Sequence, residues 1–175
     1  SAVVQKGQTT CMMAPSGAGK TTLLRILAGL EKADSGQIEG LEGLRISMVF
    51  QEDRLCENLS ASANIRLVRG KKPWGRDKKL EAKISKAMAA VGLGGCEDQP
   101  VREFSGGMRQ RTALLRALYS EWDVLFLDEP FKGLDEETKE LVIEYTKKQC
   151  FGKTVIFVTH DRSEAGKMGG RLFKM

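Results

Sequence analysis

The sequence predicts an α/β fold with a mainly parallel sheet and an inserted helical subdomain. Four continuous apolar runs are bounded by turn residues, at positions 9–14, 46–50, 124–127 and 154–159. Because these runs are continuous rather than alternating, they are typical of parallel strands covered on both faces. Segments of helical periodicity separate the runs, and this alternation of strand and helix favours a parallel sheet.

The composition is typical of one soluble globular domain. The chain has 175 residues, of which 41% are hydrophobic and 29% charged, values that exclude a disordered or fibrous protein. No apolar run approaches the roughly 18 residues of a membrane span, and no signal-peptide pattern opens the chain. The four cysteines are scattered without a C-x-x-C pair, which favours a reducing, cytoplasmic setting over a zinc site or disulfide framework.

The first apolar run leads directly into the glycine-rich loop APSGAGKTT, residues 14–22. Between a strand and a helix, such a loop holds phosphate oxygens with backbone N–H groups and the helix N-terminus. We expect Lys20 to reach the β and γ phosphates and the Thr21 hydroxyl to ligate Mg²⁺. Ala14 replaces the first glycine of the motif, which costs about 1 kcal/mol if its φ is positive. A turn that only reverses the chain is the alternative.

The region after the second apolar run has helical pattern without a convincing strand. It covers residues 59–101, and glycine and proline residues divide it near positions 70–75 and 92–95. We expect this region to form a helical subdomain inserted into an α/β core of residues 1–58 and 102–175, within a single domain spanning 1–175.

The positive charge of the chain is concentrated in this helical region. The formal net charge is +5, yet residues 66–86 contain nine basic and two acidic residues, a local charge of +7, and the remainder carries −2. This segment is a docking surface for a membrane subunit, a contact with anionic lipid or nucleic acid, or a solvated helix face.

Two later segments carry anion-binding and acidic groups. The run FSGGMRQR, residues 104–111, precedes a helix with alanine and leucine periodicity, so Ser105 forms either part of an anion site or a plain N-cap.

The strand at 124–127 ends in Asp128 and Glu129, and strand alternation sends these carboxylates to opposite faces. We expect Asp128 to hold Mg²⁺ and Glu129 to polarise a water that attacks the γ phosphate. Two solvated acids are the alternative.

Six short segments, taken in order, resemble the motifs of the ATP-binding cassette family, the ATPase subunits of ABC transporters. The most specific is FSGGMRQR, which separates this family from other phosphate-loop NTPases. His160 is the only histidine, and it indicates little by itself, but it falls at the family's last motif. The matching segments are APSGAGKTT (Walker A), Gln51 in VFQEDRL (Q-loop), FSGGMRQR (signature), VLFLDEP (Walker B), KGLD ending at Asp135 (D-loop) and VTHD (H-loop). The resemblance implies a phosphate-loop NTPase fold.

The resemblance also implies a site shared by two cassettes that pair head to tail around two ATP molecules. The loop of one copy would hold ATP, and the signature of the other copy would cap its γ phosphate. The implied catalytic residues are Glu129, His160 and Gln51, and the implied Mg²⁺ ligands are Thr21, Gln51 and Asp128. The implied ATP-binding residues are Ser16, Gly17, Ala18, Gly19, Lys20, Thr21, Thr22, Ser105, Gly106, Gly107 and Asp135, the last of which would bridge the two copies.

The implied biological role is that of a cytoplasmic ATPase, peripheral on the inner face of the cell membrane. It would act as a homodimer or paired cassette and power import through separate integral membrane permease subunits. An extracytoplasmic substrate-binding protein is expected in the complex, and no nucleic acid. The run VFQEDRL is similar to the Q-loop region of bacterial nitrate, sulfonate and taurine importers.

Two alternatives to this role remain open at the level of sequence. One is a soluble family member acting on nucleic acid or ribosomes, for which the basic segment is the support. The other is a nucleotide-binding module without turnover, favoured by Ala14 and by the lack of an aromatic residue before Lys20, where the family carries an adenine-stacking side chain. The chain is then either a naturally short cassette or a fragment.

Overall fold

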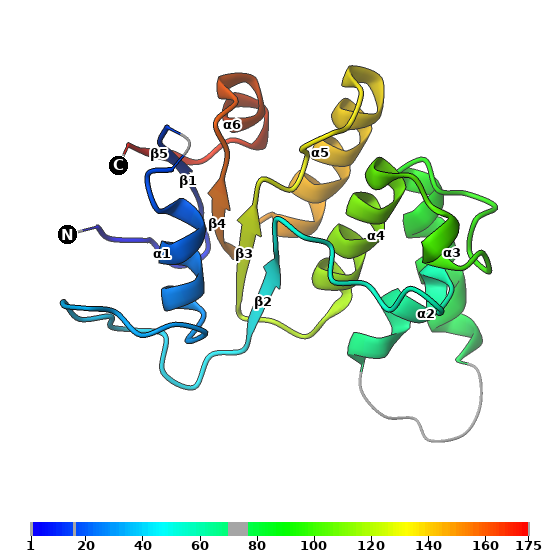
Figure 1. Ribbon diagram of the computed structural model, residues 1–175, viewed down its shortest axis with the longest axis horizontal. Helices are drawn as coiled ribbons and strands as arrows, with labels where there is room; N and C mark the ends of the chain where they lie inside the picture. The colour runs from blue at the N-terminus through cyan, green and yellow to red at the C-terminus, as the bar shows by residue number, and fades with distance from the viewer. Residues whose placement is uncertain (1, 16, 70–76, 175) are drawn as a thin grey trace. The chain divides into compact units, whose positions relative to one another are not determined.

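The computed structural model describes residues 2–15, 17–69 and 77–174, which form two compact units (Figure 1). The sheet unit comprises residues 1–51, 122–130 and 150–175, and the helical unit comprises residues 52–121 and 131–149. The two units therefore alternate along the chain, and each draws its elements from distant parts of the sequence.

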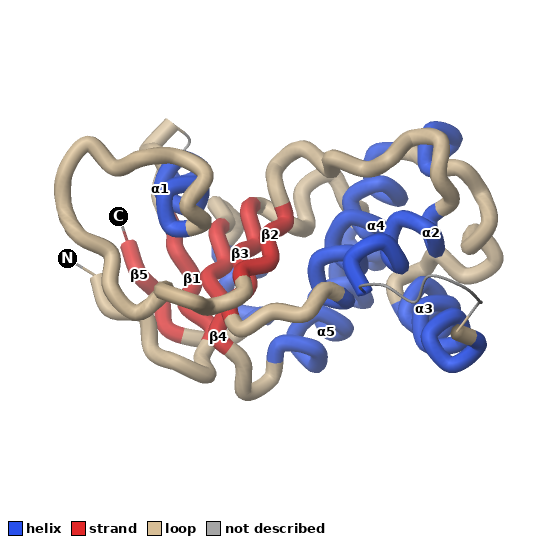
Figure 2. The backbone as a smooth tube through the Cα atoms, turned by 90° about the horizontal axis from the view of Figure 1, so that it is seen from below, coloured by secondary structure: helices blue, strands red, loops and turns tan. Residues whose placement is uncertain are grey.

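In the described part of the chain, five parallel strands form one sheet in the order β2-β3-β4-β1-β5, and Figure 2 shows them side by side. The four predicted strands are confirmed to within one residue at their carboxyl ends, and β5 is an addition that pairs with β1. The strands are β1 (Thr9–Met13), β2 (Ile46–Val49), β3 (Val124–Asp128), β4 (Thr154–Val158) and β5 (Arg171–Lys174).

The core of the sheet unit lies between the sheet and α1 (Lys20–Leu27). Leu24 of α1 is fully buried and belongs to one cluster with alternate residues of three strands. These strand residues are Met12, Val124, Phe126, Ile156 and Val158. Because β1, β3 and β4 are parallel neighbours, their carboxyl ends meet at one edge of the sheet, where ligands bind in open α/β sheets. The glycine-rich loop, the Asp128–Glu129 pair and His160 all follow these ends.

The helical unit is built from α2 (Ala61–Arg66), α3 (Lys78–Ala90), α4 (Gly106–Tyr119) and most of α5 (Glu136–Cys150). Two short 3₁₀ turns, Leu67–Arg69 and Val101–Glu103, follow α2 and precede α4. Ile65, Ile84 and Leu114, one from each of the first three helices, are at most 1% exposed.

The helical unit is larger than the segment 59–101 that the sequence predicts as a subdomain. It also takes in α4 and nearly all of α5. For α4 the physical reason is packing, since α2 lies against α4 and α3 also contacts α4. A pattern that marks each helix separately does not indicate which neighbours share its buried face.

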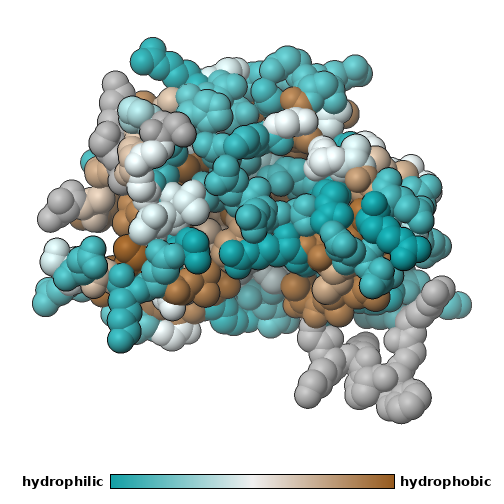
Figure 3. All heavy atoms as spheres, viewed as in Figure 1, coloured by the Kyte–Doolittle hydropathy of each residue, from teal (hydrophilic) through white to brown (hydrophobic). Residues whose placement is uncertain are grey.

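The surface is mainly hydrophilic on the face that Figure 3 shows, with hydrophobic side chains visible only in patches between polar ones. Phe151 is the most exposed of the large hydrophobic residues described, at 89%. Among the helices that the structure describes, none is long and apolar enough to cross a membrane.

Candidate functional site

The glycine-rich loop turns from β1 into α1 through two residues in the left-handed region. Gly17 has φ +82° and Gly19 has φ +81°, a conformation that costs an L side chain about 1 kcal/mol or more. Gly19 is also the N-cap of α1 and offers no side chain to its first turn, so the N–H groups there are available to an anion. Ser16 lies outside the described residues.

Ala14 carries no backbone penalty at the start of this loop. In the ranges that the structure describes, the non-glycine residues with positive φ are Arg54 and Glu129. The condition under which Ala14 would be costly is therefore not met, and the residue is 9% exposed at the end of β1. The alanine fits the loop as well as a glycine would.

Lys20 is the first residue of α1 and is buried, with only 7% exposure. Its Nζ donates hydrogen bonds to the backbone oxygens of Ala14 and Pro15, each at 2.8 Å. The ammonium is thus held inside the loop by the loop's own carbonyl groups, and it places a positive charge among the backbone N–H groups.

Thr21 and Asp128 meet between α1 and the end of β3. The Thr21 hydroxyl Oγ1 donates to Asp128 Oδ2 at 2.7 Å, and Asp128 is 2% exposed. Two oxygen ligands from different elements therefore adjoin each other, as the expected Mg²⁺ site requires. The Thr21 hydroxyl thus supplies one of the hydrogen bonds that a buried carboxylate needs.

Glu129 and His160 meet where β3 and β4 end. His160 Nδ1 lies 3.2 Å from Glu129 Oε1, and the side chains are 64% and 17% exposed. Glu129 has φ +47°, and its N–H donates to Val158 O at 2.9 Å, so neighbouring β4 holds a strained backbone in place. Strain of this kind in a non-glycine residue clusters at functional sites.

A cavity of about 750 Å³ lies beside His160 in the sheet unit. Ala14 and Pro15 of the loop line it, together with His160, Arg162 and small residues of α6 (Arg162–Met168) and the turn after it. Gln51 is exposed and follows β2 by two residues. Ala18 and Thr22 lie in the loop and in the first turn of α1.

The signature residues and Asp135 belong to the helical unit. Ser105 is the N-cap of α4, and its Oγ accepts the Met108 N–H at 3.3 Å. Gly106 and Gly107 open the helix, and a Cβ added at Gly107 would lie 3.2 Å from Leu134 Cδ2. Asp135 Oδ1 accepts the Thr138 N–H at 2.9 Å, a bond that lowers the pKa of the Asp135 carboxyl. Ser105 therefore caps α4, and its contact with ATP stays a prediction.

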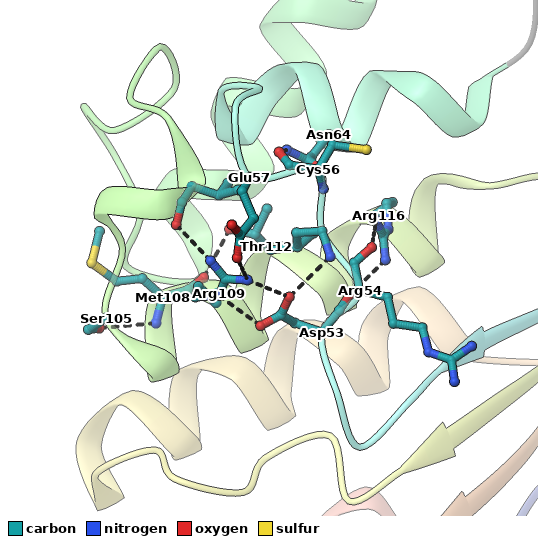
Figure 4. A network of polar contacts seen from close by, with 12 residues as sticks. Asp53, Arg54, Cys56, Glu57, Asn64, Ser105, Met108, Arg109, Thr112 and Arg116 are labelled. Atoms are coloured by element: carbon teal, nitrogen blue, oxygen red, sulfur yellow. Dashed lines mark hydrogen bonds and ion pairs between the residues drawn. The ribbon is translucent and has the colours of Figure 1, made fainter.

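Two arginines of α4 hold the segment that follows the Q-loop (Figure 4). Arg109 donates two hydrogen bonds to the Asp53 carboxylate, from Nε to Oδ2 at 2.8 Å and from Nη2 to Oδ1 at 3.0 Å. Arg116 donates to the backbone oxygens of Asp53 and Arg54, each at 2.8 Å, which supports the positive φ of Arg54. Asp53 and Arg109 are 56 residues apart in sequence, and the sequence did not predict this network.

Replacing Asp53 with Asn is expected to destabilise the helical unit by about 1 kcal/mol at pH 7, after allowance for solvent screening. Burial alone would raise the Asp53 pKa, but the Arg109 hydrogen bond, the Leu55 N–H and the Arg109 charge together lower it. A lowered pKa in the folded state stabilises the protein above the unfolded value of about 3.9. That contribution disappears as the pH falls through the folded pKa.

Urea unfolding of wild type and Asp53→Asn at several pH values measures this effect. The difference in the free energy of unfolding should be full at neutral pH and should shrink on acidification below about pH 4. Asp98→Asn, the same change at an exposed position of the helical unit, is the control and should leave the midpoint unchanged. A difference that does not depend on pH contradicts the ion-pair account.

The basic segment is only partly described, because residues 70–76 lie outside the described ranges. Arg66 pairs with Glu81 at 2.9 Å, and Arg69 donates to Tyr119 O at 3.5 Å. Lys79, Lys83 and Lys86 are exposed along α3. These features agree with a solvated helix face and equally with a docking surface.

Comparison with known proteins gives consistent matches. Residues 1–132 match the family model described as ABC transporter. The sulfate/thiosulfate import ATP-binding protein CysA of Xanthomonas campestris pv. campestris is 38% identical over 97% of this chain and 53% of its own length. The chain thus spans about half the length of that relative. The aliphatic sulfonates import ATP-binding protein SsuB 1 of Pseudomonas savastanoi pv. phaseolicola is 37% identical over 98% of this chain and 70% of its own length.

A solved structure agrees with these sequence relatives. It is described as the dimeric structure of a post-hydrolysis state of the ATP-binding cassette MJ0796 bound to ADP and Pi, and it covers 99% of this chain and 83% of its own. The TM-score is 0.84 at 27% sequence identity. The predicted phosphate-loop NTPase fold and the predicted likeness to sulfonate import cassettes are both confirmed. The chain belongs to the ABC transporter family and corresponds to its ATP-binding domain.

Proposed function

We propose that this chain binds and hydrolyses ATP and thereby powers import through a separate membrane permease. The observation that carries the proposal is the contact of Glu129 with His160, at 3.2 Å, at the same sheet edge as the phosphate loop. A carboxylate fixed beside an imidazole is suited to orient and deprotonate a water. The relatives named above are import ATP-binding proteins, which supports the transport role.

The loop supplies the binding half of this chemistry. The N–H groups at Gly17, Gly19 and the start of α1 would hold the phosphates. An ammonium has three N–H donors, so Lys20 can keep its two loop bonds and still donate to a β or γ phosphate oxygen.

The oxygen pair of Thr21 and Asp128 fits Mg²⁺. Both are hard oxygen donors, 2.7 Å apart, and Mg²⁺ in such sites is bound through one or two carboxylates together with phosphate and water. Thr21 and Asp128 would hold the ion, with Gln51 as a further ligand. When bound, Mg²⁺ supplies charge that neutralises the phosphates during transfer. Without the ion, the Asp128 carboxylate keeps its hydrogen bond from the Thr21 hydroxyl.

Catalysis would depend on positioning and electrostatics shared by several side chains. Glu129 would accept a proton from the attacking water, and His160 would hydrogen-bond the γ phosphate and fix the Glu129 carboxylate. Ser105 and the N–H groups of Gly106 and Gly107, in a second copy of the chain, would cap the γ phosphate. Asp135 would bridge the two copies.

The complex we propose is a dimer of this cassette on permease subunits at the cytoplasmic face of the membrane, with an extracytoplasmic protein that delivers cargo. The two relatives are named for different cargo, sulfate or thiosulfate in one and sulfonates in the other, so no cargo is assigned to this chain.

Two measurements test the proposal. Phosphate release from ATP should require Mg²⁺ and stop in EDTA, and the tagged protein should co-purify with a polytopic membrane protein from its own membranes. Binding to RNA or DNA with a steep salt dependence, without a membrane partner, would instead favour the nucleic-acid alternative.

A further inference from the structure

A buried carboxylate lies next to the strand end that carries His160. Glu164, the third residue of α6, is 6% exposed, and Thr159 is 1% exposed. The Thr159 hydroxyl Oγ1 donates to Glu164 Oε2 at 2.6 Å. A short hydrogen bond from a hydroxyl to a carboxylate is among the stronger ones that proteins make, so the orientation of this hydroxyl is fixed.

The same hydroxyl holds the residue on the other side of His160. Because its proton goes to Glu164, Thr159 Oγ1 can present a lone pair, and it accepts the Asp161 N–H at 3.0 Å. The Asp161 carboxylate in turn caps α6 by accepting the Ser163 N–H at 2.7 Å. The two residues that flank His160, Thr159 and Asp161, are therefore both held through the Thr159 hydroxyl.

His160 itself has little packing to hold it. Its side chain is 64% exposed, so surrounding side chains restrict its rotamer weakly. The direction of the imidazole toward Glu129, at 3.2 Å, then depends on the backbone that carries it. The Thr159 N–H donates to Met12 O of β1 at 3.3 Å, and the Thr159 hydroxyl bonds with Glu164 and Asp161 add side-chain restraints on the carboxyl side of β4.

We propose that Glu164 is a positioning residue that sets the orientation of His160 through Thr159. This inference rests on the proposed ATPase function, because the consequence of a misplaced His160 is slower hydrolysis. Asp161 at the N-cap and Glu164 three residues later form a capping-box pattern, which by itself explains helix initiation. The buried Thr159 bond goes further and ties the third residue of α6 to the residue that precedes His160.

Replacing Glu164 with Ala is expected to lower kcat roughly tenfold, because small misplacements of catalytic groups are costly. The dissociation constant for ATP should stay close to that of the wild type, since Glu164 does not lie in the phosphate loop. Glu164→Gln keeps an oxygen that can accept the Thr159 proton, and it should recover most of the lost rate.

A double-mutant cycle separates positioning from general destabilisation. In the His160→Ala background, measured by single-turnover hydrolysis, Glu164→Ala should cause no further loss of rate. An equal loss of rate in both backgrounds overturns the proposal, because Glu164 would then act independently of His160.

Thr159 provides a second pair of variants if Glu164→Ala fails to fold. Thr159→Val removes the hydroxyl at nearly constant volume and should reproduce the loss of kcat. Thr159→Ser keeps both hydrogen bonds and should recover most of it. Equal rates for the two variants contradict the proposal.

The NMR signals of the imidazole give a readout that does not depend on hydrolysis. His160 is the only histidine of the chain, so an untagged protein gives one set of ring signals. Glu164→Ala and Thr159→Val should shift these signals, and Thr159→Ser should not. If the wild type fails to hydrolyse ATP, the proposed function fails, and unmoved ring signals are the separate result that overturns the role of Glu164.

Discussion

Replacing Glu129 with Gln is expected to slow ATP hydrolysis by roughly two to four orders of magnitude while ATP binding stays near the wild-type level. Gln has the shape of Glu and can keep the contact with His160, but its amide cannot accept a proton from water. Two copies of the variant should therefore pair around ATP, and the dimer should persist because the ATP is not hydrolysed. Single-turnover phosphate release measures the rate, and size-exclusion chromatography with ATP measures the accumulated dimer.

Glu39→Gln is the matched control for this experiment. Glu39 is an exposed residue of the sheet unit in the loop between α1 and β2, and the same change there should leave the rate of hydrolysis unaltered. Near-normal turnover of Glu129→Gln would contradict the assignment of Glu129 as the base and would favour another group that accepts the proton.

Replacing Lys20 with Ala is expected to weaken ATP binding by roughly 10- to 100-fold. A hydrogen bond from a charged donor contributes about 1.5–3 kcal/mol, and each 1.4 kcal/mol is a factor of ten in affinity. Lys20 is held inside the loop by the carbonyls of Ala14 and Pro15, and we expect its ammonium to contact the β and γ phosphates rather than the α phosphate. Titration calorimetry with ATP and with AMP measures this difference, and AMP affinity should change little.

Lys32→Ala removes the same charge from an exposed position of the sheet unit and serves as the control. Its ATP affinity should equal that of the wild type, and circular dichroism should show that both variants are folded. Equal loss of ATP and AMP binding in Lys20→Ala would indicate that the loop has collapsed, and it would contradict a specific contact with the outer phosphates.

The sheet could be predicted from the sequence wherever the strands are buried on both faces. β3 and β4 are continuous apolar runs, and their predicted ends agree with the structure to one residue. β5, with the sequence RLFK, could not be predicted because it is short and mixes charged with apolar residues at the edge of the sheet. α6 was missed for a related reason, since its seven residues contain too few apolar positions to show a helical period.

The site was predictable where a short sequence motif indicates the chemistry of its residues. The contact of Thr21 with Asp128 agrees with the predicted Mg²⁺ pair, although 107 residues separate the two. The positive φ of Glu129 could not be predicted, because pairing of its N–H with β4 imposes it. Glu164 and the Asp53–Arg109 pair were missed because tertiary packing brings these residues to their partners.

The most direct test of the shared-site account is the rate of Mg²⁺-dependent ATP hydrolysis as a function of protein concentration. If the loop of one copy and the signature of another complete each site, the rate per molecule should rise with protein concentration and then level off as dimers form. A rate per molecule that stays constant across a wide dilution series, in protein shown to be monomeric, would contradict the account.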